Sequence, residues 1–130
     1  MKKIILAPIS AKNPHALANY AHEISEAANF RPIMWDGEVN GKDEIGDVFG
    51  FVDIVNDTIT VFERVIAVLG SSARRVHWNG TYSSQASGKL KNVLVVSSFF
   101  KTISYSKFKQ DAGYKPNLVL SGTKRLDWPY

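Results

Sequence analysis

The chain has no cysteine among its 130 residues. That absence excludes a disulfide-stapled scaffold, thiolate metal ligands and cysteine nucleophiles. It also fits a reducing compartment, so we expect a cytoplasmic protein. Long apolar runs are absent as well: the longest, near Ile4–Ile9 and Val65–Leu69, fall far short of the roughly 20 residues that span a membrane. We therefore expect no membrane partner.

Acidic side chains are scarce in the second half of the chain. Residues 67–130 hold ten Lys and Arg side chains but only two acidic ones, Asp111 and Asp127. Residues 1–66 have the opposite balance, with six basic and ten acidic side chains. A strongly basic half within a small protein favours a polyanionic partner, most often nucleic acid.

The length and composition indicate one globular domain spanning residues 1–130. Hydrophobic residues make up 45% of the chain and charged residues 22%, which is ordinary for a soluble protein with a real core. We find no internal repeat and no linker-like segment. One domain therefore has to provide both the core and any binding surface.

The first half reads as strand, helix and strand. A β-branched apolar run predicts a strand over Lys3–Ile9, and Asn13-Pro14 is typical of a helix start, with the helix ending near Ala28-Asn29. A short strand is expected at Ile33–Trp35, followed by a Gly-containing loop over Asp36–Asp47.

The second half reads as a set of strands with one short helix. We expect strands over Val48–Val55, Thr58–Leu69, Asn92–Phe100 and Asn117–Thr123, and a helix over Ser104–Asp111. Asn56-Asp57 favours a tight turn, and a slip in the alternation at Phe62-Glu63 predicts a bulge. The Ser- and Gly-rich segment 70–91 has no periodic pattern. The fold class is therefore α+β, a small, curved, mostly antiparallel β-barrel with peripheral helices.

All three tryptophans lie beside turns or in the tail, outside the apolar runs. Trp35 precedes Asp36-Gly37, Trp78 precedes Asn79-Gly80, and Trp128 is near the C-terminus. Aromatic rings in such positions can stack on extruded bases. The alternative is that they only cover the ends of the barrel, since tryptophan is usually well buried.

Other polar residues are candidates for contacts with bases and phosphates. Ser10 follows the first strand and can read a base edge, whereas Asn13 has an obvious second role as the helix cap. Among the basic residues, the strongest candidates for phosphate contacts are the pairs Arg74-Arg75 and Lys124-Arg125, and Lys101 is a further candidate. Dispersed basic residues are also what an ordinary solvated surface contains.

No pattern of residues indicates a metal or a cofactor. His15, Asn19, His22 and Glu26 share one helix face, but the histidines are two turns apart and an exposed face is the expected explanation. The chain has no Gly-rich phosphate loop, and His77 has no partner in its neighbourhood that would make it a general base. We therefore expect no metal, no cofactor and no catalytic residues.

The order of these motifs resembles EVE-type domains of the PUA-like superfamily, which also includes YTH and ASCH domains. The matching features are a strand ending in the Ser10 turn, a helix followed by Trp35, the Arg75-Val76-His77-Trp78 segment, and Gly113-Tyr114-Lys115-Pro116-Asn117 followed by Gly122 and Arg125. The resemblance covers nearly the whole chain, although residues 81–89 do not align with it.

The resemblance implies a pocket that accepts a flipped and often modified base. By position, its walls would be Trp35 and Trp78, with polar edges from Ser10 and Asn13. Asp36 would accept a hydrogen bond from an exocyclic amine of the base, and Phe99 would line the pocket. Because no effector domain is attached, a separate partner protein would supply any catalysis.

Three functions follow from these observations. The leading hypothesis is a binding module for DNA or RNA that reads a modified or flipped base and does no chemistry. One alternative is a small ASCH-like ribonuclease or base-processing hydrolase that uses Lys101, Tyr105 or His77. The other is a protein-interaction module with an acidic partner.

Overall fold

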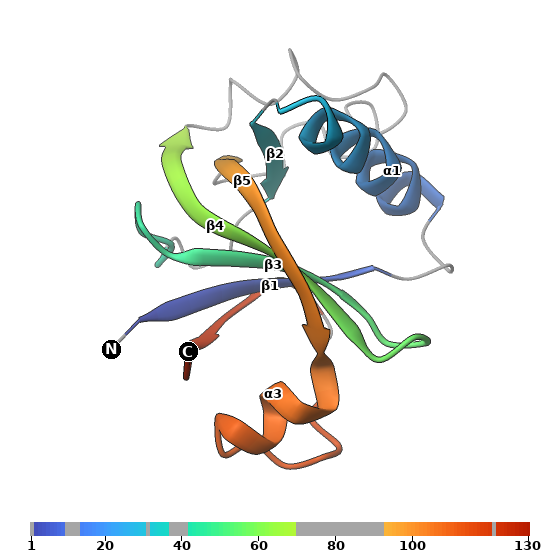
Figure 1. Cartoon of the computed structure of the whole chain (residues 1–130), viewed down its shortest axis with the longest axis vertical. Helices are drawn as coiled ribbons and strands as arrows, with labels where there is room; N and C mark the ends of the chain where they lie inside the picture. Colours follow the sequence, from blue (N-terminus) through green and yellow to red (C-terminus); the bar gives the residue numbers. More distant parts are fainter. Residues whose placement is uncertain (1, 10–13, 31, 37–41, 70–92, 121) are drawn as a thin grey trace.

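The computed structural model describes residues 2–9, 14–30, 32–36, 42–69, 93–120 and 122–130. These residues form one mixed six-stranded sheet with a helix on either side (Figure 1). The strand order is β2-β5-β4-β3-β1-β6. The strands are β1 Lys3–Ile9, β2 Ile33–Asp36, β3 Val48–Asp53, β4 Thr58–Leu69, β5 Val93–Ser104 and β6 Lys124–Asp127, and the helices are α1 Pro14–Ala28 and α3 Tyr105–Asp111. This arrangement confirms the α+β class.

Strand β1 occupies the interior of the sheet and is buried on both faces. It pairs in parallel with β3 and antiparallel with β6. Ile4 and Leu6 face one core cluster, while Ile5 and Ala7 face the other. A continuous apolar run is typical of a strand covered on both sides, which explains why the predicted bounds of this strand match the observed ones.

The two core clusters lie on opposite faces of the sheet. One face packs against α1, whose Tyr20, Ile24 and Ala27 contact the cluster containing Phe51 and Trp35. The other face packs against α3, which contributes Tyr105 and Phe108 to the second cluster. Figure 1 shows α1 above the strands and α3 below them. Any site on this sheet therefore belongs to either an α1 face or an α3 face.

Two register shifts interrupt the antiparallel pairing of β4 with β5. The first lies between Val61 and Phe62, where β5 carries one residue more than β4, and the second lies between Val65 and Ala67. The first lies beside Phe62-Glu63, where a bulge or bend was predicted, although its extra residue is on β5 and not on β4. Bulges bend a strand and increase its twist, which accounts for the strong curvature of β4 in Figure 1.

Helix α3 begins where the β3–β4 turn meets the end of β5. The Ser104 hydroxyl accepts from the backbone N–H of Lys107, as an N-cap does. Asp57, in the turn predicted at Asn56-Asp57, accepts from the backbone N–H of Ser106 at 3.0 Å and from its hydroxyl at 2.8 Å. The turn thus fixes the direction in which α3 leaves the sheet.

The prediction of a last strand at Asn117–Thr123 is wrong. The final strand is β6, Lys124–Asp127, which follows the predicted strand. In the structure the described residues of this segment pair with no strand, and the Leu118 N–H donates to the Lys115 carbonyl at 3.0 Å in a turn. β6 pairs with the edge of β1 that β3 leaves free. The Trp128 N–H donates to the Lys2 carbonyl at 3.0 Å and so continues this pairing by one residue.

Two other strand ends differ from the predictions by more than one residue. β3 ends at Asp53 and not at Val55, because the Asp53 carboxylate accepts from the backbone and side-chain N–H groups of Asn56 and closes a turn. β5 continues to Ser104, four residues beyond the predicted Phe100, because it pairs with β4 along its whole length.

Candidate functional site

A cavity of about 330 Å³ opens beside the C-terminal residues of the chain. Its walls come from the starts of β1 and β3, the middle of β4, the end of β5 and the residues after β6. The lining residues are Lys2, Val48, Val61, Phe62, Glu63, Lys101, Trp128 and Tyr130. Apolar, aromatic and charged side chains therefore meet in one place.

The cavity lies on the α3 face of the sheet. Val48, Val61 and Trp128 all belong to the core cluster on that face. Alternate residues of a strand point to the same side, so Glu63 shares the side of Val61. Lys101 pairs directly with Val61 on the neighbouring strand. The floor is thus apolar and buried, while the charged side chains stand at the edge.

The aromatic wall is held in a fixed orientation. The Tyr130 ring meets the Trp128 ring edge-on, with centroids 5.0 Å apart at 85°. Trp128 in turn stacks on Phe108 of α3, with centroids 5.9 Å apart at 28°. The Tyr130 hydroxyl donates to the carboxylate of Asp111 at the end of α3. Two independent contacts with α3 therefore position this wall.

The environment of Tyr130 raises the pKa of its hydroxyl. Partial burial, together with the hydrogen bond to Asp111, raises the pKa of Tyr130 to about 12. The same hydrogen bond, followed by that from Lys107, lowers the pKa of Asp111. At neutral pH the phenol remains a donor to an ionised carboxylate, so the tether between the C-terminal residues and α3 is intact.

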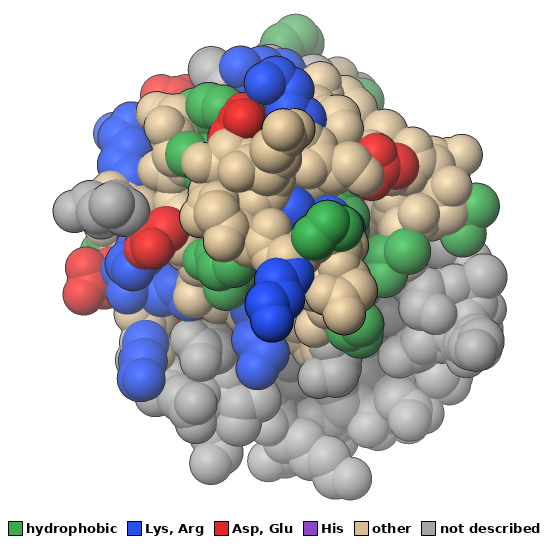
Figure 2. Space-filling model, turned by 90° about the horizontal axis from the view of Figure 1, so that it is seen from below, with side chains coloured by type: hydrophobic (Ala, Val, Ile, Leu, Met, Phe, Trp, Pro, Cys, Tyr) green, Lys and Arg blue, Asp and Glu red, His purple; other side chains and the backbone are tan. Residues whose placement is uncertain are grey.

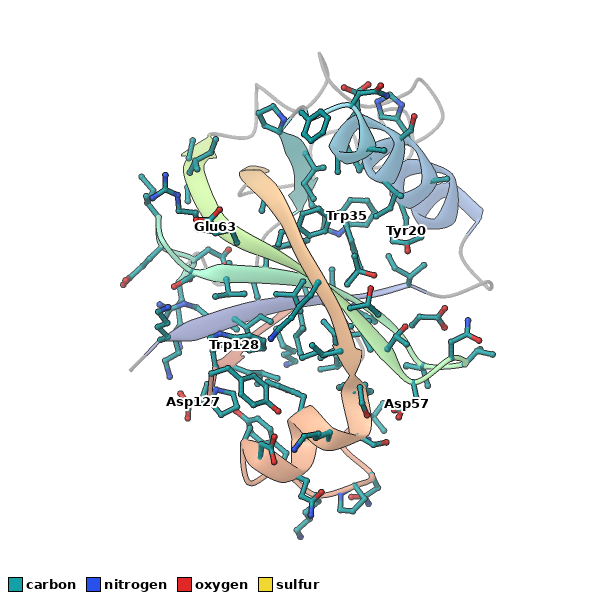
Figure 3. The ribbon with its side chains drawn as sticks, viewed as in Figure 1. Tyr20, Trp35, Asp57, Glu63, Asp127 and Trp128 are labelled. Atoms are coloured by element: carbon teal, nitrogen blue, oxygen red, sulfur yellow. The ribbon has the colours of Figure 1, made fainter. Side chains whose placement is uncertain are left out.

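Trp35 lies on the opposite face of the sheet from this cavity. Its ring is buried on the α1 face and meets the Phe51 ring edge-on at 4.8 Å, and Phe51 also contacts Tyr20 of α1. Figure 3 shows Trp35 beside α1 and Trp128 on the side of α3. Both tryptophans pack into the core, as the alternative of a covering role allows.

Several predicted site residues lie outside the described part of the chain. They are Ser10, Asn13, Arg74, Arg75 and Trp78, and the side chains of Asp36 and Phe99 are likewise not described. The base pocket predicted from Trp35 and Trp78 therefore remains a prediction. Among the predicted site residues that the structure describes, Lys101 lines the cavity.

Lys124 and Arg125 point to different faces of β6. Lys124 is exposed and alternates with Leu126, which packs on the α3 face, so it shares the face of the cavity. The Arg125 guanidinium donates to both carboxylate oxygens of Asp47, at 2.7 and 3.1 Å, and also lies 3.6 Å from Glu44. The hydrogen bond to Asp47 raises the pKa of Arg125. Arg125 therefore joins β6 to the loop before β3.

Of the described candidate enzyme residues, Lys101 lines the cavity and Tyr105 does not. Tyr105 is 3% exposed and its hydroxyl lies 3.5 Å from the Leu118 carbonyl, within the core. Lys101 is exposed at the cavity, and His77 lies outside the described residues. On α1, the His22 Nε2 and the Glu26 Oε1 lie 4.0 Å apart. Among the described residues, no group of three His, Cys, Asp or Glu side chains is placed to hold a metal ion.

Sequence reasoning missed Lys2, Glu63 and Tyr130. Lys2 and Tyr130 are brought together by the pairing of β1 with β6, and no local pattern predicts that pairing. Glu63 carries a weak signal, because it sits at the predicted bulge, and bulges often lie beside functional sites.

No helix in the described part of the chain is long and apolar enough to cross a membrane. Comparison of the chain with protein-family models, with curated proteins and with solved structures finds no match.

Proposed function

We propose that this chain is a nucleic-acid-binding module that accepts an unpaired base in the cavity on the α3 face. The observation that carries the proposal is the meeting of Trp128 and Tyr130 with Lys2 and Lys101 in one cavity. Proteins that bind single strands combine aromatic rings, each contributing about 1–3 kcal/mol by stacking on a base, with basic side chains along the backbone. The volume of about 330 Å³ lies at the lower end of the range of about 300–1,000 Å³ typical of small-molecule sites.

The fixed aromatic wall also supports this proposal. A ring already held in place loses little conformational entropy when a ligand binds, so more of the contact energy appears as affinity. Tyr130 is 49% exposed and is anchored through Asp111, so its ring can meet a ligand without first being ordered.

The distribution of charge fits contact with a short stretch of nucleic acid. On the face seen in Figure 2, Lys and Arg side chains are interspersed with acidic and apolar ones and do not form one continuous block. Lys3 pairs with Asp127, and Lys107 pairs with Asp111. Few phosphates would then be neutralised at once, and the base contact would carry more of the affinity.

We further propose that the chain is a cytoplasmic relative of the EVE-type domains with a PUA-like barrel. The bulged and bent β4–β5 pair and the order of strand, helix and strand in the first half support this proposal. In the described residues the sheet is open, with β2 as one edge strand and β6 as the other. That the sheet closes into a barrel is therefore part of what we propose. The pocket expected from Trp35 and Trp78 would be a separate site on the α1 face.

Salt-dependent binding to single-stranded oligonucleotides tests the proposed function. Fluorescence anisotropy should show affinity falling as salt rises, because bound phosphates release counterions. Lys2→Ala should weaken binding and lower the slope of log affinity against log salt by about one, and Lys101→Ala should also weaken binding. Lys115→Ala removes an exposed lysine that does not line the cavity, and it serves as the matched control. Absence of binding at low salt would rule the proposal out.

A further inference from the structure

Glu63 shares the cavity with two lysines, and this combination limits what can bind there. A carboxylate only accepts hydrogen bonds, and an ammonium group only donates them. Glu63 on β4 and Lys101 on β5 lie on adjacent strands, on the same face and beside the same bulge. A ligand edge that presents donors to Glu63 next to an acceptor for Lys101 would match both groups.

The other end of the cavity offers a positive charge beside an aromatic ring. Lys2 and Trp128 are joined by a backbone hydrogen bond of 3.0 Å. β4, β3 and β1 are successive neighbours, so at about 4.8 Å per strand the backbones of β4 and β1 are about 10 Å apart. The apolar Val48 and Val61 form the floor between the two ends. A ligand that fits both ends would combine a flat ring, a polar edge that meets Glu63 and Lys101, and an anionic group that meets Lys2.

Guanine is the base whose edge fits these groups best. It presents two adjacent donors, N1–H and the exocyclic N2–H₂, which one carboxylate can accept together, and its O6 is an acceptor beside them. Adenine and cytosine offer a single amine beside an acceptor nitrogen. Uracil and thymine place carbonyl oxygens on both sides of one N–H, where they would oppose the carboxylate.

We infer that the cavity reads a guanine nucleotide unit, with the guanine edge on Glu63 and Lys101 and the phosphate on Lys2. The inference rests on the proposed function and extends it by naming the base and assigning its recognition to Glu63. The same chemistry is present in an unpaired guanosine within a strand and in free guanosine monophosphate. The experiment therefore contains an arm for each source.

The first arm uses single-stranded oligothymidylates in which one central position is guanine, inosine, adenine or cytosine. Anisotropy at fixed salt should show tighter binding to guanine by at least about fivefold, the lower limit for a bidentate base contact. Inosine lacks the N2 amine, so it should bind more weakly than guanine. The second arm measures whether guanosine monophosphate competes with the guanine oligonucleotide more effectively than inosine monophosphate does.

The variant that tests the reading is Glu63→Gln, which replaces one of two acceptor oxygens with a donor and leaves the shape nearly unchanged. It should abolish the preference for guanine over inosine without weakening binding to plain oligothymidylate. Glu26→Gln is the matched control, because Glu26 lies on α1, beyond the opposite face of the sheet. This control should retain the preference of the unmodified protein.

The outcomes separate this inference from the proposed function. Binding of all four oligonucleotides with equal affinity, or a guanine preference that survives Glu63→Gln, overturns the guanine reading and leaves nucleic-acid binding in place. Binding of guanosine monophosphate without binding of any strand overturns the nucleic-acid proposal but supports the guanine site. Absence of binding in both arms overturns both.

Discussion

Replacing Arg125 with alanine is expected to lower the free energy of unfolding by about 3–5 kcal/mol, the usual cost of removing one partner of a buried ion pair. The side chain of Asp47 is only 7% exposed and that of Arg125 18%. Without the guanidinium, the Asp47 carboxylate loses two hydrogen bonds and remains buried with a negative charge. Urea denaturation followed by circular dichroism measures the loss.

Two further variants show whether the loss comes from the ion pair. Lys124→Ala, at the neighbouring exposed position, should change the stability by less than about 0.5 kcal/mol. Combining Arg125→Ala with Asp47→Asn should cost less than the sum of the single changes, because the second removes the charge that the first leaves unpaired. A loss of less than about 1 kcal/mol in Arg125→Ala would contradict a structural role for this contact.

Replacing Phe108 with alanine is expected to cost about 3–5 kcal/mol, as for other fully buried aromatic side chains. Phe108 is 0% exposed and stacks on Trp128, and its ring centroid lies 6.2 Å from that of Tyr114. It is therefore the main anchor of α3 on the sheet and the support beneath the aromatic wall of the cavity. We expect lower stability and a change in the near-ultraviolet circular dichroism of the remaining folded protein.

The control for Phe108→Ala lies on the same helix. Lys107→Ala removes an exposed pair with Asp111, which should contribute only about 0.3–0.5 kcal/mol. If the two variants unfold at the same urea concentration, α3 is not held by the packing of Phe108, and the account of the α3 face is wrong.

The sequence was sufficient where burial is continuous and contacts are local. The bounds of β1 and β4 were predicted because their apolar β-branched runs are bordered by turn residues, and the Ser104 start of α3 is a local capping signal. The position of β6 was not predictable, because Lys124–Asp127 has no strand-like burial pattern and is a strand only through its pairing with β1.

The candidate site was less accessible from sequence than the fold. Its charged residues come from positions 2, 63 and 101, which meet through strand order and one bulge. The sequence left open whether Trp35 and Trp128 are buried or face a ligand. Trp35 and Trp128 have turn-like or tail-like neighbours in sequence, but the sheet and its helices enclose them. The basic second half suggested a polyanion without indicating that Arg125 is engaged by Asp47.

The central claim is that a base enters the cavity beside Trp128, and the fluorescence of that residue tests it most directly. In a protein carrying Trp35→Phe and Trp78→Phe, Trp128 is the remaining tryptophan. Titration with a guanine-containing single strand should quench its emission in proportion to the bound fraction measured by anisotropy. Binding of the strand without any change in Trp128 emission would contradict the claim and place the nucleic acid elsewhere on the protein.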